Sequence, residues 1–177
     1  MSTTKWALDP SHSEVSFKIK HMMISNVTGH FGAFNVTAET EGDDFSKSKV
    51  SFTADVNSIN TKSEQRDGHL KSGDFFDAEK YPHIKFEATK MNKVSDDEFS
   101  VDGNLTIRDV TKPVKLKAEF GGIAKDPYGN IKAGFTVEGK INRKDFGLTW
   151  NAATEAGGVM VGEDLKIHSE IQLVKQP

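Results

Sequence analysis

The sequence contains no cysteine, and this absence excludes several kinds of site at once. Without cysteine there is no disulfide framework, no thiol nucleophile and no thiolate ligand for a metal ion. Long apolar runs are missing too, since no run approaches the roughly 20 residues that a helix needs to cross a bilayer. Together with a mean hydropathy of -0.52, this argues against a membrane protein.

Charge of one sign is not clustered anywhere along the chain. The 23 basic and 26 acidic residues are intermixed and give a formal net charge of -3. A protein that binds phosphate backbones needs a basic face. We therefore expect no nucleic-acid partner.

Catalytic and metal-binding motifs are also absent. The six histidines include no H-x-H or H-E-x-x-H spacing, and the chain has neither a G-x-S-x-G motif nor a P-loop. We therefore expect no catalytic residue, no metal site and no cofactor, and we predict that the protein is not an enzyme.

The length of 177 residues fits one domain over residues 1–177, because nothing in the chain resembles a linker. Residues 1–9 lack the apolar core of a secretory signal. This predicts a cytoplasmic protein, or a periplasmic one if a signal peptide has been removed from a longer precursor.

Apolar and polar residues alternate with period two along much of the chain. Most of the 12 phenylalanines lie in the apolar phase. Successive side chains of a strand point to opposite faces, so each such run has one buried and one wet face. Eight stretches alternate clearly: 15–21, 32–38, 50–56, 84–88, 99–107, 114–120, 131–141 and 165–173. A ninth, 6–8, is too short to assign. Short loops between the runs predict an all-β fold, an extended eight-stranded antiparallel barrel.

Two segments interrupt this rhythm. In residues 60–78, Thr61 and Glu64 have the spacing of a capping box, which predicts a short helix in the 61–72 region. Residues 142–162 include a run of small residues, which predicts a long, mobile loop. The sequence of residues 126–130, with Pro127 and Gly129, predicts a hairpin turn.

An eight-stranded barrel has an interior that is either filled by side chains or able to hold one small ligand. Small residues recur in the inward phase, at positions 32, 54, 88, 103, 118, 133 and 139, and this favours a cavity over a filled core. We expect an apolar tail to lie among Phe17, Ile19, Phe34, Phe52, Phe86, Leu105, Leu116, Phe135 and Ile167.

Polar groups near one mouth of the barrel are candidates to contact a head group. His21 continues the apolar phase of its strand, while Arg66 and His69 lie on the predicted helix. A structural role is the alternative for each of them: Asp67 would pair with Arg66 or orient His69, pinning the helix to the barrel. Leu70, Phe75 and Phe146 complete the expected ligand-binding set as apolar residues of the two interrupting segments.

Five blocks of sequence, in order, carry a resemblance to a known family. They are WALDPSHSEVSF (6–17) with His21 and VTGHFG (27–32); RDGHLKSGDFFD (66–77) with YPHIKF (81–86); GNLTIR (103–108) with VTKPV (110–114); INRKDFGL (141–148); and VGEDLKI (161–167). On these blocks the chain resembles the YceI-like family over nearly its whole length.

The resemblance implies a lipocalin-like barrel, often a homodimer, that holds a polyisoprenoid such as an isoprenoid quinone or polyprenyl lipid, or another long-chain amphiphile, in a tunnel. One departure is Asp109, where the family's pattern has glycine; we expect Asp109 to take the positive φ of this turn. Two alternatives stay open: an enzyme that acts on a hydrophobic substrate through Asp67 and His69, and a dimeric interaction module with a filled core.

Overall fold

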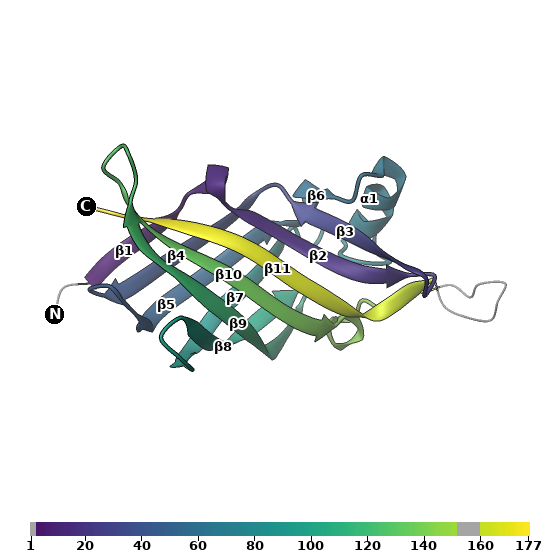
Figure 1. Cartoon of the computed structure of the whole chain (residues 1–177). Helices are drawn as coiled ribbons and strands as arrows, with labels where there is room; N and C mark the ends of the chain where they lie inside the picture. Colours follow the sequence, from purple (N-terminus) through teal and green to yellow (C-terminus); the bar gives the residue numbers. More distant parts are fainter. Residues whose placement is uncertain (1–2, 152–159) are drawn as a thin grey trace.

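A computed structural model describes residues 3–151 and 160–177, and in this part of the chain the fold is almost entirely β (Figure 1). The strands are β1 (Thr3–Leu8), β2 (Glu14–His21), β3 (Ser25–Phe31), β4 (Phe34–Glu41), β5 (Asp44–Asp55), β6 (Ile59–Asn60), β7 (His83–Lys93), β8 (Glu98–Ile107), β9 (Val110–Lys125), β10 (Ile131–Asn142) and β11 (Val161–Lys175). The helices are α1 (Glu64–Lys71) and the short 3-10 segments η1 (Pro10–His12), η2 (Val56–Ser58) and η3 (Arg143–Phe146).

Eight strands close a ring in which every pairing is antiparallel. The order is β1, β4, β5, β7, β8, β9, β10 and β11, and β11 pairs back with β1. The remaining strands lengthen this ring: β2 pairs with β11 beyond β1, β3 pairs with β2, and β6 pairs with β3. The predicted eight-stranded antiparallel barrel is confirmed. Three of its eight strands are interrupted, and each of these counts as two strands in the numbering: β1 and β2, β3 and β4, and β5 and β6.

The expected strands all occur, and two further strands, β3 and the two-residue β6, were not predicted. Residues 6–8, too short to assign from the sequence, belong to β1, which closes the ring. The longer of these two strands is β3. Its inward residue Gly29 has no side chain, and the ring of Phe17 fills the place where a Cβ would be. A glycine therefore stands where the alternation needs an apolar residue, and the pattern cannot be seen in the sequence.

The helix forms where it was expected, but its cap differs from the prediction. Ser63 is the N-cap, and its hydroxyl accepts a hydrogen bond from the backbone N–H of Arg66. The hydroxyl of Thr61 instead donates to Asp67 at 2.5 Å. The predicted Thr61–Glu64 capping box is therefore wrong, because the Thr61 hydroxyl is already committed to that carboxylate.

The predicted turns are present with one change. Residues 126–130 connect β9 and β10, with Gly129 at a φ of 88°. In the hairpin between β8 and β9, the residue with positive φ is Arg108 (57°) and not Asp109. The turn therefore survives the departure from the family's pattern by placing its left-handed residue one position earlier than expected.

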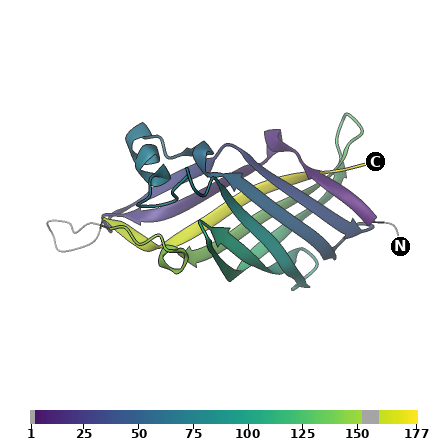
Figure 2. The same cartoon turned by 180° about the vertical axis from the view of Figure 1, so that it is seen from behind.

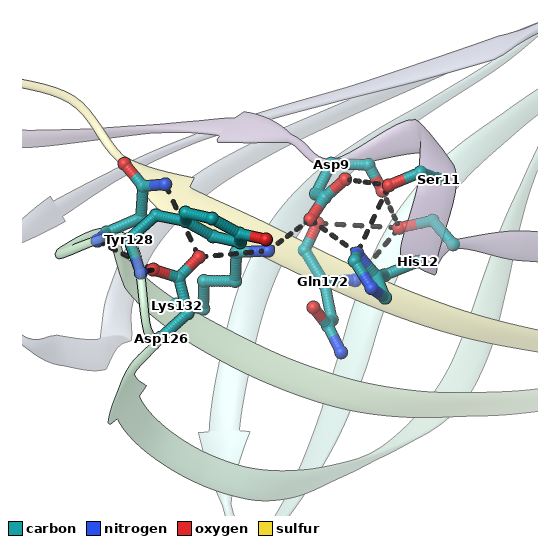
Figure 3. Close-up of polar contacts among 9 residues, drawn as sticks. Asp9, Ser11, His12, Asp126, Tyr128, Lys132 and Gln172 are labelled. Carbon is teal, nitrogen blue, oxygen red and sulfur yellow. Dashed lines mark hydrogen bonds and ion pairs between the residues drawn. The ribbon is translucent and has the colours of Figure 1, made fainter.

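The interruption between β1 and β2 is fastened by a polar cluster (Figure 3). Asp9 accepts hydrogen bonds from Lys132 at 2.5 Å and from Ser11 at 2.9 Å, and its carboxylate also contacts His12. Lys132 lies 3.5 Å from Asp126 of the β9–β10 turn. The hydrogen bond from Lys132 holds the pKa of Asp9 well below its usual range, so this carboxylate is charged at neutral pH.

The two ends of the barrel differ. The amino and carboxyl ends of the chain and the β9–β10 turn lie at one end, and α1 lies toward the other (Figures 1 and 2). The loop predicted over 142–162 is described in part: residues 143–146 form η3, and the small residues 152–158 lie outside the described residues. No helix in the part of the chain that the structure describes is long and apolar enough to cross a membrane.

Candidate functional site

The barrel encloses a chamber, which we call the inner chamber, with a volume of about 200 Å³. One buried water needs roughly 10–15 Å³ on the same measure, so this space is far larger than a packing defect. Among the described residues its lining holds no charged side chain, and its polar residues are Ser16 and Ser169. The apolar lining comes from strands all around the barrel and includes Phe17, Phe31, Phe45, Phe52, Phe76, Phe86, Leu105, Leu116, Phe135, Ile167 and Leu173.

Small inward residues do not create this space in the way the sequence suggested. Of the seven, Ala54 and Ala118 line the inner chamber. At Gly103 the ring of Phe86 occupies the place of a side chain, and at Gly139 the side chain of Leu116 does so. The space beside each of these two glycines is filled by a larger neighbour, Phe86 or Leu116. The expectation that small inward residues leave room is therefore wrong at Gly103 and Gly139.

An aromatic cluster fills the barrel at the end where the chain termini lie. Phe45 is central, with ring centroids 5.1 Å from Trp6, 5.6 Å from Phe120 and 4.9 Å from Phe135. Phe99 adds an edge contact to Phe120 at 6.3 Å. Phe45 and Phe135 also line the inner chamber, so the cluster forms the floor of that chamber.

A second space, the outer chamber, lies beside α1 and has a volume of about 180 Å³. It shares three lining residues, Phe17, Phe76 and Leu165, with the inner chamber. The two chambers are therefore neighbours, separated by these three side chains. Its remaining lining includes Ile19, Lys20, His21, Arg66, His69, Leu70, Phe75, Arg143, Leu148, Trp150 and Met160.

Arg66 reaches the outer chamber from the first turn of α1. Its Nε donates to the Thr61 hydroxyl at 2.8 Å and its Nη2 to the Thr61 carbonyl at 2.5 Å. The third nitrogen, Nη1, has no partner among the described residues. The Thr61 backbone N–H and hydroxyl donate to Asp67, so the guanidinium and the carboxylate are joined through Thr61.

His69 belongs to a group of rings at the edge of the outer chamber. Its ring packs edge-on against Trp150, at 4.6 Å between centroids, and against Phe75 at 5.1 Å. Its Nε2 lies 2.9 Å from a carboxylate oxygen of Asp74. The partner of His69 is thus Asp74 and not Asp67, so the Asp67–His69 pair needed by the enzyme alternative is not formed.

Arg143 is a cationic wall residue that is only 2% exposed. Its guanidinium donates to four backbone carbonyls, those of Leu148, Trp150, Val161 and Gly162. Burial lowers its pKa, and the charge of Glu163 opposes this shift; arginine starts so high that it stays charged at neutral pH. Arg143 therefore joins η3 to the start of β11 and keeps a positive charge in the wall of the outer chamber.

Most of the predicted ligand-binding residues lie in one of the two chambers. The inner chamber receives Phe17, Phe52, Phe86, Leu105, Leu116, Phe135 and Ile167, and the outer chamber receives Ile19, His21, Arg66, His69, Leu70 and Phe75. Phe34 and Phe146 line neither chamber. Phe34 packs against Phe52 on the wall, and Phe146 is almost fully buried in η3.

The predicted ligand-binding set omitted several lining residues, of which Phe76, Arg143 and Trp150 matter most. Trp150 and Arg143 fall in an irregular segment without a period-two pattern, so no pattern assigned them to a face. The available signal was the occurrence of an arginine and a tryptophan in the same segment that interrupts the alternation. Among the described residues, no group of three or more His, Asp and Glu could hold a metal ion.

Comparison with protein families gives a match along almost the whole chain. The YceI-like domain model matches residues 6–173. A UPF0312 protein of Staphylococcus aureus (strain N315) is 41% identical over 170 residues, which cover 96% of this chain and 96% of that protein.

Solved structures share the barrel. The YCEI protein of Campylobacter jejuni has a TM-score of 0.77 and 36% identity, over 96% of this chain and 97% of that chain. A polyisoprenoid binding domain from Saccharophagus degradans has a TM-score of 0.72 over 97% and 98% of the two chains. Its identity is 15%, so this second likeness is one of fold.

Proposed function

Since the chain belongs to the YceI-like family, we propose that it is a binding and carrier protein for a polyisoprenoid, such as an isoprenoid quinone or polyprenyl lipid, or another long-chain amphiphile. The tail would lie in the inner chamber, and the head group would lie in the outer chamber. In this proposal the protein holds its cargo without covalent chemistry.

One observation carries the proposal: the inner chamber is large, and the described residues that line it include no charged group. Such a space binds an alkyl or prenyl chain by removing it from water, and each buried methylene contributes about 0.8 kcal/mol. A tail of moderate length is thus held tightly with few polar contacts. The fold likeness to a polyisoprenoid binding domain of another organism supports the same ligand class.

The proposal also assigns a role to the partition between the chambers. Phe17, Phe76 and Leu165 belong to three separate segments: β2, the turn after α1, and β11. A chain that joins the two chambers has to pass among them. Rotation of these side chains, and not opening of the hydrogen-bonded barrel, would then admit the tail.

Calorimetric titration with geranylgeraniol, a 20-carbon isoprenoid alcohol, tests the proposal. We expect one molecule to bind per chain with a negative heat-capacity change, because apolar surface is buried. Ala118→Phe, which introduces a ring into the inner chamber, should weaken binding at least tenfold. Failure of the wild-type protein to bind this alcohol or hexadecanol would sink the proposal, whatever the variant does.

The control for that variant is a ring added outside the chamber. Ser51 lies on β5 among exposed polar groups, where its hydroxyl donates to Glu87, and it does not line the inner chamber. Ser51→Phe should leave the affinity for geranylgeraniol within about twofold of wild type. Thermal unfolding of both variants shows whether each is folded under the titration conditions.

We further propose the homodimer that the family resemblance implies. Light scattering coupled to size-exclusion chromatography measures the mass directly, against 19.5 kDa for the single chain. A mass twice that value is expected, and a single-chain mass across the micromolar range contradicts this part of the proposal.

A further inference from the structure

The two chambers differ sharply in charge. In residues 3–151 and 160–177, no charged residue lines the inner chamber. Lys20, Arg66 and Arg143, in contrast, contribute to the wall of the outer chamber together with His21 and His69. No carboxylate is among the described residues that line the outer chamber. The space proposed for the head group is therefore bounded by cationic and neutral groups.

Carboxylates close to this wall are already engaged elsewhere. Asp67 accepts hydrogen bonds from the backbone and hydroxyl of Thr61. Asp74 contacts His69 at 2.9 Å, and Glu163 contacts Lys144 at 2.8 Å. None of them makes an ion pair with Arg66 or Arg143 in the part of the chain that the structure describes, so those two charges lack a contacting counterion.

Both arginines are held in place by oxygen atoms of the backbone or of a hydroxyl. The four carbonyls around Arg143 fix its position without an ion pair, and the charge of Glu163 acts on it without a contact. Arg66 is fixed through Nε and Nη2, so its Nη1 remains available to a ligand. A guanidinium held in this way is a strong donor to carboxylate or phosphate oxygens.

We infer that the outer chamber selects an amphiphile with an anionic head, a carboxylate or a phosphate, which Arg66 contacts directly while Arg143 acts through its field. This inference rests on the proposed carrier function and narrows it to acidic amphiphiles. A neutral head group of the same size would forgo the charge-assisted hydrogen bonds and bind more weakly.

Matched ligands with one tail and different heads test the inference. Dodecanoate, dodecyl phosphate and dodecanol are titrated into the wild-type protein below their critical micelle concentrations, at low and at high salt. We expect at least one anionic ligand to bind tenfold or more tightly than dodecanol at low salt, with the difference shrinking in high salt. The relative affinities of dodecanoate and dodecyl phosphate identify the preferred acid.

Three variants separate charge from structure at Arg66. Arg66→Gln should reduce the preference for the anionic ligand at least threefold while changing dodecanol affinity little. Arg66→Lys keeps the charge but loses the paired contacts to Thr61, and it should retain most of the preference. Lys71→Gln removes a positive charge from the same helix at a residue that does not line the chamber, and it should leave the preference unchanged.

The outcomes distinguish this inference from the carrier function. If dodecanol binds the wild-type protein as tightly as both anions, the inference is overturned and the carrier function stands. If no ligand of any chain length binds, the carrier function fails first. If Arg66→Gln weakens the acid and the alcohol equally, Arg66 supports the chamber wall and does not recognise the head.

Discussion

Gly103 shows how a single residue shapes the wall of the inner chamber. A Cβ at this position would overlap the ring of Phe86 and would lie 2.6 Å from the carbonyl oxygen of Glu87. The ring is large and the carbonyl belongs to a hydrogen-bonded strand, so neither can move cheaply. The glycine is therefore required by close approach, since its φ is not among the positive values.

Gly103→Ala is expected to destabilise the fold by about 1–3 kcal/mol, the usual effect of overpacking. Gly134 is the matched control, because it also lies in a strand but has no atom within 4 Å of a built Cβ. Gly134→Ala should change the free energy of unfolding by less than about 0.5 kcal/mol. Urea denaturation of the two variants measures both, and equal losses would contradict this account of the wall.

Asp9 gives a prediction about pH. Its pKa is lowered in the folded state by the hydrogen bond from Lys132, so the carboxylate stabilises the fold above its ordinary pKa of 3.8. That stability is lost as the pH falls below the ordinary value toward the lowered one. Asp9→Asn should cost about 1.5–3 kcal/mol at neutral pH, as expected for hydrogen bonds to a charged group.

As the pH falls below about 5, the free energy of unfolding of Asp9→Asn should also decrease less steeply than that of wild type. Chemical denaturation at a series of pH values measures the slope. Asp43→Asn removes an exposed ion pair with Lys175 and is the control, with an expected cost below about 1 kcal/mol. Parallel curves for wild type and Asp9→Asn would refute the role given to this carboxylate.

Among the elements, the aromatic floor of the inner chamber has the clearest functional consequence. Phe45, Phe120 and Phe135 pack within 6 Å of one another, and with Trp6 they occupy the barrel interior beyond the chamber. A tail that enters from the α1 end meets these rings. We therefore expect the floor to limit the length of tail that the protein can bury.

Phe135→Leu shortens one of the rings that line the chamber, and it should move the optimum of a fatty-acid series toward longer chains. Affinity should then rise by up to about fourfold for each additional methylene until the new floor is reached. Phe99→Leu is the same change in the same cluster at a residue that does not line the chamber. An unchanged optimum in Phe135→Leu, or an equal change in Phe99→Leu, would contradict this role of the floor.

The elements also show what could be predicted from sequence and what could not. Period-two alternation located most strands of the ring, because one face of each is buried and the other carries polar residues. It missed β3, where Gly29 replaces an apolar side chain in the pattern. It also gave no position for Trp150 and Arg143, because residues in irregular segments have no periodic face.

For the whole molecule, alternation predicts a closed wall but does not distinguish a filled interior from a hollow one. That outcome depends on how rings such as Phe86 lie against neighbouring strands, and such packing is a tertiary property. The head-group residues Arg66 and His69 were predicted from their place on the helix, yet their partners Thr61 and Asp74 were not. The chemistry of the outer chamber therefore follows from the fold and not from a local motif.

The central claim is that the barrel interior holds the tail of an amphiphile that enters beside α1. A crystal structure of the protein with geranylgeranyl phosphate tests this most directly. The account predicts tubular electron density that starts at Arg66, passes among Phe17, Phe76 and Leu165, and ends at Phe45 and Phe135. Density for the ligand on the outer surface, with the inner chamber empty, would contradict it.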